Sequence, residues 1–193
     1  MDYKETYKNL FGTNDYSTHQ ETEYRYQLVL NYLKNNNVKT LVDISSGRGV
    51  MLQLIKREFP NVKIISTDLE RFHEVEVEEF REVDLSDEST QFTTPTKYDL
   101  LTCLDVLEHL DKSFINNVFK WFSEVSKNQI LTIANHSEIL NGVEIHTIRE
   151  DMTYWGPIVN EFLELKNETS KTFIHKGKPH YLYVLNTESK IKK

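Results

Sequence analysis

The chain has 193 residues, of which 38% are hydrophobic and 27% charged, a composition typical of one globular domain. The formal net charge of −7 argues against a nucleic-acid partner, because binding to phosphates usually requires a basic surface. No run approaches the roughly 20 apolar residues of a membrane helix, and the polar N-terminus does not resemble a secretory signal, so we expect no membrane association. The single cysteine, Cys103, cannot form an internal disulfide, which predicts a reducing, cytoplasmic location.

Short apolar runs alternate with amphipathic stretches along the chain, which predicts βαβ units around a parallel sheet. Helices are expected over 20–35, 50–59 and 113–126. Buried strands are expected over 38–44, 62–66, 80–83, 98–104 and 129–134. A further helix over 149–164 should be interrupted near Gly156-Pro157, and strands over 160–166 and 180–186 should form a hairpin around the turn-forming segment 167–179.

The most informative segment is LVDISSGRG, residues 41–49, in which a buried strand leads into a glycine turn and then a helix. Glycines let the backbone approach a ligand closely, and the helix N-terminus offers N–H groups to an anion. That anion would be the pyrophosphate of a dinucleotide or the carboxylate of S-adenosylmethionine. Leu52 stands where a dinucleotide fingerprint has its third glycine, which argues against a dehydrogenase.

Three further features follow this segment in order. Asp68 ends the second strand, 19 residues after Gly49, where a carboxylate can accept both hydroxyls of a ribose. Asp84 follows the third strand, where its side chain can bind an adenine amino group. The fourth strand runs into LDVLEHL, residues 104–110. An aspartate at a strand end is more often a cap or turn former, but this order and spacing favour a nucleoside site.

These motifs resemble those of class I S-adenosylmethionine-dependent methyltransferases, in the family's order, over residues 38–135. The resemblance implies an α/β, Rossmann-like three-layer sandwich with a mostly parallel seven-stranded sheet and an antiparallel last strand. It also implies that ten residues line the cofactor: Asp43, Ser45, Gly47, Gly49, Asp68, Leu69, Asp84, Leu85, Leu104 and Asp105. Ser45 departs from the family, which usually has a glycine there. A serine fits with a negative φ, whereas a required positive φ would weaken cofactor binding.

We expect one methyltransferase domain with three parts. Residues 1–37 would form a helical lid, residues 38–135 the cofactor-binding core, and residues 136–193 an acceptor-site insertion followed by the C-terminal strands. The tyrosine-rich N-terminal segment suits a lid and a dimer surface equally, so both a monomer and a homodimer stay open.

Asp105, Glu108 and His109 have the spacing i, i+3, i+4, so a helical turn after the fourth strand would place them on one face. They are candidates for a general base or a metal site, or they cap a helix and hold a loop. A similar acid-x-x-Glu-His segment occurs in small-RNA 2′-O-methyltransferases and ubiquinone-pathway O-methyltransferases. That resemblance implies a divalent metal held by Asp105, Glu108, His109 and a distal histidine, His146 or His136, although Asp105 replaces the usual glutamate. The residue types do not select one metal.

Residues 135–155 follow the fifth strand and are expected to lie over the acceptor. The candidate catalytic residues are therefore His109, His136 and His146. The polar and aromatic composition suits a small acceptor, such as a sugar or another hydroxylated metabolite, methylated on O or N. The alternatives are an RNA or protein methyltransferase, a cofactor-binding relative without turnover, and an enzyme that cleaves S-adenosylmethionine itself.

Overall fold

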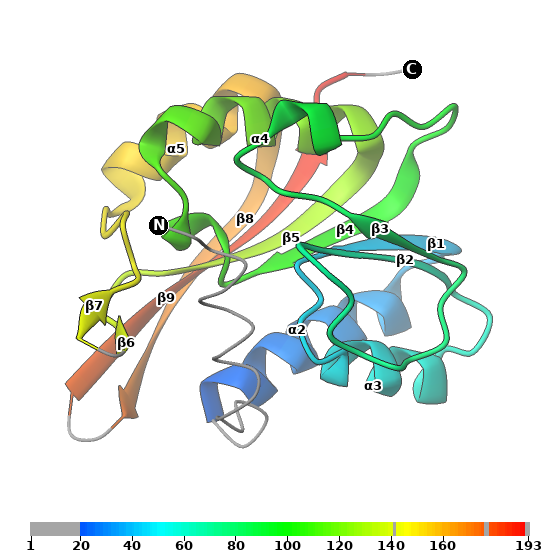
Figure 1. Cartoon of the computed structure of the whole chain (residues 1–193), viewed down its shortest axis with the longest axis horizontal. Coiled ribbons are helices and arrows are strands. Elements are labelled where there is room, and N and C mark those ends of the chain that lie inside the picture. The colour runs from blue at the N-terminus through cyan, green and yellow to red at the C-terminus, as the bar shows by residue number, and fades with distance from the viewer. Residues whose placement is uncertain (1–19, 141, 176–177, 192–193) are drawn as a thin grey trace.

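A computed structural model describes residues 20–140, 142–175 and 178–191. Its main sheet has seven strands in the order β3-β2-β1-β4-β5-β9-β8, with helices on both faces (Figure 1). β9 runs antiparallel to both of its neighbours, and the strands from β3 to β5 are parallel. The prediction of a Rossmann-like three-layer sandwich with a reversed last strand is confirmed.

The described strands of this sheet are β1 Thr40–Ile44, β2 Lys63–Asp68, β3 Glu79–Glu82, β4 Tyr98–Leu104, β5 Ser126–Ala134, β8 Leu163–His175 and β9 Lys178–Ser189. The described helices are α2 Gln20–Asn35, α3 Val50–Glu58, α4 Lys112–Val125 and α5 Met152–Phe162. Short elements complete the described fold: η2 Glu88–Thr90, η3 Leu107–His109, and a small hairpin of β6 Ile139–Leu140 and β7 Val143–Glu144. None of the described helices is long and apolar enough to cross a membrane.

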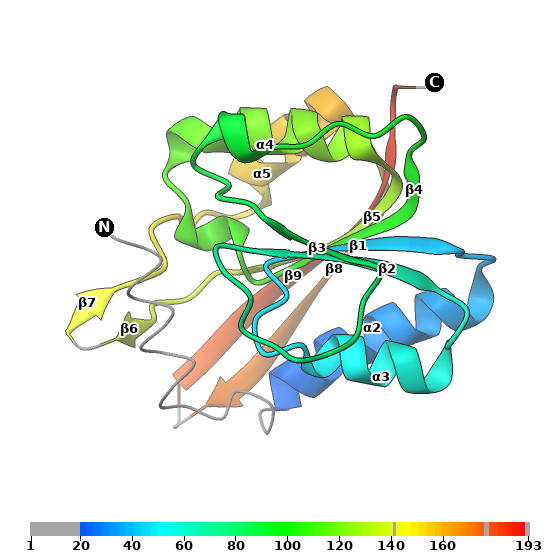
Figure 2. The same cartoon turned by 45° about the vertical axis from the view of Figure 1, so that its right-hand side comes forward.

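The central strands are buried on both faces, because α4 and α5 cover one face and α2 and α3 the other (Figure 2). Phe119, Phe122 and Trp155 are fully buried between the first helix pair and the sheet. On the second face, Val29 of α2 and Ile55 of α3 pack beneath β1 and β2. This packing explains the continuous apolar runs that indicated buried parallel strands.

The end of the chain differs from the prediction. Residues 167–174 were expected to form turns, but they belong to β8 and pair with β9 from Asn167 opposite Asn186 to Ile174 opposite Pro179. A bulge separates Leu165 from Asn167. β8 is the edge strand, so its polar side chains stay in solvent while its backbone bonds to β9, and this pairing outweighs the local turn preference.

The expected interruption near Gly156-Pro157 is also wrong, because α5 continues through both residues. Trp155 and Val159 on this helix are fully buried against the α4 face of the sheet. Burial of that apolar stripe offsets the one backbone hydrogen bond that Pro157 removes. At the other end of the chain, residues 1–19 of the expected lid lie outside the described residues, and α2 is described from residue 20.

Candidate cofactor and acceptor site

The carboxyl ends of β1, β2 and β4 meet at one edge of the sheet, because these strands are parallel neighbours. Asp68 is the last residue of β2 and lies at this edge. Its Oδ2 accepts a hydrogen bond from the Gly47 backbone N–H (2.8 Å), and its Oδ1 accepts one from the Leu69 N–H (2.8 Å). A carboxylate offers about four lone-pair sites, so both oxygens keep the capacity to accept a further hydroxyl. This geometry suits the expected binding of a ribose.

The glycine loop between β1 and α3 is built from left-handed backbone conformations. Ser45, Gly47 and Gly49 have φ values of 57°, 53° and 70°. Ser45 therefore takes the positive φ that its substitution for glycine had put in question, at a cost of roughly 1 kcal/mol for a residue with a Cβ atom. Gly49 has a second constraint, because a Cβ there would lie 2.8 Å from the Cβ of His73 and 2.8 Å from Cγ2 of Val75.

Asp43 lies on the core side of this loop and is buried. Thr102 Oγ1 donates to its Oδ1 (2.6 Å), and Thr67 Oγ1 donates to its backbone carbonyl (3.2 Å). Burial raises the pKa of Asp43 to about 7 and the pKa of Asp68 to about 6, and in both cases hydrogen bonds to the carboxylate act in the opposite direction. This edge of the sheet is thus an acidic, partly desolvated surface, which suits a cationic sulfonium compound.

Asp84, Leu69, Leu104 and Leu85, which were also predicted to line the cofactor, differ from one another in location and burial. Asp84 follows β3, and its Oδ1 accepts from the N–H and the hydroxyl of Ser86 (2.8 and 2.6 Å), so it holds the turn after this strand. Leu69 and Leu104 are half-buried at the ends of β2 and β4. Leu85 is buried in the core under α4, where its side chain contributes to packing.

An ion pair that the sequence did not indicate joins α2 to this edge. Arg25 of α2 pairs with Asp105, which follows β4 and has a φ of 54°. Thr132 Oγ1 of β5 donates to the other carboxylate oxygen of Asp105 (2.7 Å). The two contacts hold the Asp105 side chain between α2 and β5. No periodicity links position 25 to position 105, so only the tertiary structure could reveal this pair.

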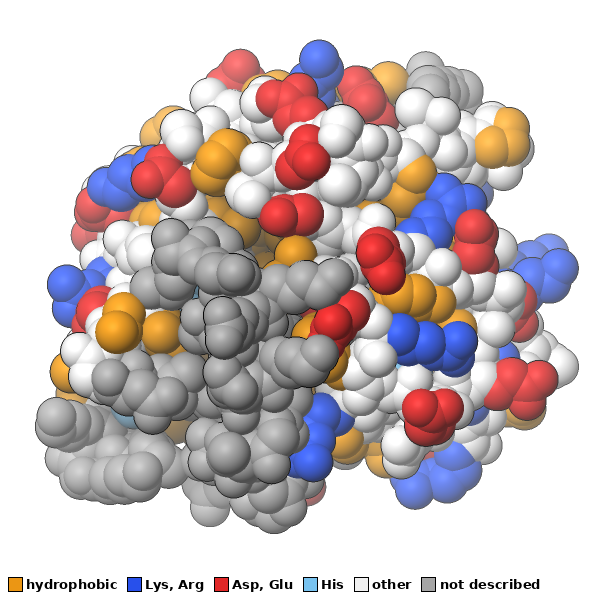
Figure 3. Space-filling view, in the orientation of Figure 1, with side chains coloured by type: hydrophobic (Ala, Val, Ile, Leu, Met, Phe, Trp, Pro, Cys, Tyr) orange, Lys and Arg blue, Asp and Glu red, His pale blue; other side chains and the backbone are white. Residues whose placement is uncertain are grey.

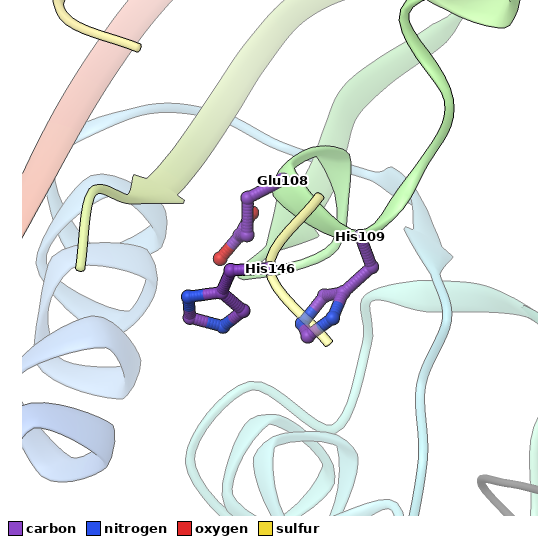
Figure 4. Close-up of side chains that lie close together, drawn as sticks. All are labelled: Glu108, His109 and His146. Carbon is purple, nitrogen blue, oxygen red and sulfur yellow. The ribbon is translucent and has the colours of Figure 1, made fainter. Parts of the chain in front are cut away.

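Beside Asp105 a cluster of titratable side chains forms. Glu108 and His109 project from η3 toward His146, which follows β7 (Figure 4). One ligand atom from each of these three residues lies within 4.8 Å of the others. The rings of His109 and His146 are 4.6 Å apart. The Nδ1–H groups of His109 and His146 donate to the backbone carbonyls of Ile145 (3.0 Å) and His136 (2.8 Å), respectively. In the neutral form of each ring, Nε2 therefore carries the lone pair.

Glu108 is fully buried, and its two carboxyl oxygens differ in their hydrogen bonding. Oε1 accepts from the Ala134 N–H (3.0 Å), whereas Oε2 has no hydrogen-bond partner among the described residues. Burial, reinforced by the Asp105 carboxylate, raises the pKa of Glu108 to about 8. A buried carboxyl oxygen without a partner is costly in a native protein unless a ligand, water or ion satisfies it.

The insertion after β5 adds a second group of side chains. His146 Nε2 lies 3.3 Å from Oε2 of Glu138, and His136 Nε2 lies 4.0 Å from the same oxygen. The His136 ring stacks on the His180 ring of β9, with centroids 3.7 Å apart. The sequence analysis named His136 and His146 but missed Glu138 and His180. Glu138 stands two residues after His136, and that proximity was the available signal.

The carboxylates and burial act on the histidines in opposite directions. Burial and the nearby His146 lower the pKa of His109 to about 4, and burial and His180 lower that of His136 to about 4. Burial also lowers the pKa of His146, but the Glu138 and Glu108 carboxylates outweigh it and raise the value to about 9. The hydrogen bond with His146 in turn lowers the pKa of Glu138 to about 2.

The expected grouping of Asp105 with Glu108 and His109 on one helical face does not form. Asp105 adopts a left-handed conformation before η3 begins, so its side chain leaves the turn in another direction and meets Arg25. Of the four residues in the metal hypothesis, three converge: Glu108, His109 and His146. All three catalytic candidates, His109, His136 and His146, do lie together, since the His146 ring contacts both of the others.

The sheet order, the left-handed glycine loop and the acid at the end of β2 define the Rossmann-like class of S-adenosylmethionine-dependent methyltransferases. Residues 16–164 match the family described as "Methyltransferase domain". The chain therefore belongs to this family and is an S-adenosylmethionine-dependent methyltransferase. No curated protein sequence matches the chain.

Solved structures share this fold. The N-methyltransferase NodS from Bradyrhizobium japonicum WM9, in complex with S-adenosylhomocysteine, is similar with a TM-score of 0.63 and 14% identity, over 94% of this chain and 98% of that one. The methyltransferase domain of bacterial CtHen1-C has a TM-score of 0.61 and 18% identity, over 88% and 100%. The N-terminal domain of EvdMO1, solved in the presence of S-adenosylhomocysteine and D-fucose, has a TM-score of 0.58 and 13% identity, over 98% of this chain and 98% of that one.

Proposed function

We propose that this chain transfers the methyl group of S-adenosylmethionine to an oxygen or nitrogen of a small polar acceptor, a sugar or another hydroxylated metabolite. The observation that carries the proposal is the group of histidines and carboxylates at the ends of β4 and β5, beside Asp105 and under the insertion after β5. Two fold neighbours support the acceptor class: one is named an N-methyltransferase, and another was solved with D-fucose present.

In this proposal the cofactor lies across the strand ends. Asp68 accepts the ribose hydroxyls, and Asp84 binds the adenine, with Leu69 and Leu104 beside the nucleoside. The backbone N–H groups of the first turn of α3, which follows Gly49, bind the methionine carboxylate. Asp43 and Asp105 then face the positively charged part of the cofactor.

The chemistry is an in-line displacement. A lone pair of the acceptor forms a bond to the methyl carbon, the carbon–sulfur bond breaks, and its electron pair stays on sulfur, so S-adenosylhomocysteine leaves. Alignment of the two reactants supplies most of the rate, because the sulfonium is already a good leaving group. The acceptor also loses a proton. His109 and His136, whose lowered pKa values keep them neutral near pH 7, are the proposed proton acceptors, with His146 positioned by Glu138.

We also propose that Glu108, His109 and His146 bind a divalent cation; in that state His136 takes the proton, because Nε2 of His109 would be bound to the ion. The residues fit such a group: Glu108 carries a buried oxygen without a described partner, and both histidines donate Nδ1–H to backbone carbonyls, the arrangement that orients metal-binding imidazoles. When bound, the cation would polarise an acceptor hydroxyl and lower its pKa. The donor set suits magnesium, manganese, iron or zinc.

The surface favours a small acceptor over RNA. On the face in Figure 3, acidic and basic side chains alternate, and the described residues there form no continuous basic patch. The acidic net charge acts in the same direction. We further propose that the chain forms a single domain and is a monomer or a homodimer. We also propose a cytoplasmic location, which is in keeping with the buried free thiol of Cys103.

The test is to incubate the protein with S-adenosylmethionine and a panel of hydroxylated and amino acceptors, and to detect S-adenosylhomocysteine by mass spectrometry. Acceptor-dependent product supports the proposal. Product without an acceptor identifies a cofactor-cleaving enzyme, and binding without any product identifies a non-catalytic relative. A second arm adds EDTA and then returns a metal; unchanged turnover in that arm contradicts the cation hypothesis alone.

A further inference from the structure

Asp105, the predicted fourth ligand of the cation site, already has other partners for both of its carboxylate oxygens. Asp105 accepts from Thr132 Oγ1 through Oδ1 and pairs with Arg25 through Oδ2. Its negative charge is therefore already balanced, and releasing it would leave the largely buried Arg25 beside a strand end. Aspartate is also one methylene shorter than glutamate. The cation site consequently has three converging side chains and needs another donor from elsewhere.

Glu138 lies next to the cation site rather than inside it: with His136 and His146 it forms a second group of potential ligand atoms, and His146 belongs to both groups. Oε2 of Glu138 is 3.3 Å from Nε2 of His146, the atom that would bind the cation. Two ligand atoms that are each about 2.1 Å from a tetrahedral ion are about 3.4 Å apart, so this separation fits a pair of ligands. The Glu138 side chain is 35% exposed, which leaves it room to adjust.

The backbone holds Glu138 opposite His146. The Glu138 N–H donates to Glu144 Oε1 (2.8 Å), and the Glu138 carbonyl accepts from the Ile145 N–H (2.9 Å), so the β6–β7 hairpin brings positions 138 and 146 together. His146 completes the link, because its Nδ1–H donates to the carbonyl of His136, two residues before Glu138. The two sides of the insertion are thus tied to each other through the same residues that present the donors.

We propose that Glu138 is the fourth protein ligand of a divalent-cation site formed with Glu108, His109 and His146, and that Asp105 is not a ligand. The inference rests on the cation site proposed above. Once the cation has displaced the proton of His146, two carboxylates and two neutral imidazoles balance the charge of a divalent ion, just as Arg25 balances Asp105. The second carboxylate comes from the insertion, so the segment that covers the acceptor also completes the site.

Two matched variants separate Glu138 from Asp105. Glu138→Gln and Asp105→Asn each remove one charge at nearly constant volume, and Glu108→Gln serves as the positive control for a lost ligand. Binding of Mn²⁺ and Zn²⁺ is measured by titration calorimetry, and the visible absorption of bound Co²⁺ reports the ligand set. Far-UV circular dichroism and thermal melts show whether each variant is folded.

Glu138→Gln should weaken cation binding at least about 10-fold and change the Co²⁺ spectrum, while Asp105→Asn stays within about 2-fold of wild type. The opposite result, or equal losses in both variants, overturns the assignment and makes Asp105 a ligand. If both variants bind the cation with wild-type affinity and Glu108→Gln does not bind it, Glu138 is not a ligand, but the cation site itself is supported. Absence of cation binding to the wild-type protein overturns the site itself, whereas methyl transfer is tested independently.

Discussion

Burial of the Asp43 carboxylate should cost stability at alkaline pH, and replacement by asparagine should recover it. The pKa of Asp43 rises from its ordinary value of 3.8 to about 7, chiefly through burial. A group with a raised pKa favours the folded state fully below pH 3.8, and this contribution is lost as the pH rises through about 7. At about 1.4 kcal/mol per pH unit, the loss above pH 7 is at most about 4 kcal/mol. The asparagine side chain of the Asp43→Asn variant has no charge to desolvate, and its oxygen can still accept from Thr102.

Thermal melts of the ligand-free protein from pH 4 to pH 9 measure this effect. Asp43→Asn should melt above wild type at pH 9, by at most about 8–16 °C for a chain of this size, and the gap should close toward pH 4. Asp87→Asn is the control. Asp87 is exposed and its pKa is lowered, so the difference in melting temperature between Asp87→Asn and wild type should be constant from pH 5 to pH 9. The reasoning would be refuted if the difference in melting temperature between Asp43→Asn and wild type did not depend on pH, or if Asp43→Asn were less stable than wild type at pH 9.

Two further predictions concern the cofactor edge. Asp68→Asn should weaken S-adenosylhomocysteine binding by about 10-fold or more, because a hydrogen bond to a charged group contributes about 1.5–3 kcal/mol, and calorimetry measures the change. Since the pKa of Asp68 is about 6, the wild-type affinity should fall more steeply than the variant's affinity as the pH drops below 6; a parallel pH dependence in both proteins contradicts this role. Gly49→Ala should lower the melting temperature by more than Gly142→Ala, because both have positive φ but only the Cβ at 49 meets His73 and Val75. Equal losses in the two alanine variants would show that the close approach at Gly49 is relieved without cost.

Local sequence pattern determined the half of the molecule that carries the proposed cofactor site. Residues 41–49 encode a buried strand and a glycine turn that leads into the helix from Val50, and Asp68 and Asp84 each end or follow a recognisable strand. The carboxyl ends of parallel strands necessarily share an edge, so their order along the chain was enough to bring these residues together. The seven-stranded architecture followed from the same motifs, because the resemblance rests on their order.

The acceptor half depended on contacts between distant residues. Helical spacing predicted one face for Asp105, Glu108 and His109, but the left-handed backbone at Asp105 and its pairing with Arg25, 80 positions away, separated the first from the others. Glu138 joined the histidines only because the β6–β7 hairpin turns the chain back on itself. Likewise, polar residues 167–174 entered a strand because β9 offered them backbone partners.

The sequence by itself determined those features whose forces act between near neighbours: the alternation of strands and helices, the glycine loop, and the acids at strand ends. Tertiary structure alone decided which charges pair, which carboxylate is buried without a partner, and how far β8 extends. The physical reason is that the pairing and desolvation of a charge depend on every segment that packs around it, and these segments are not adjacent in the chain.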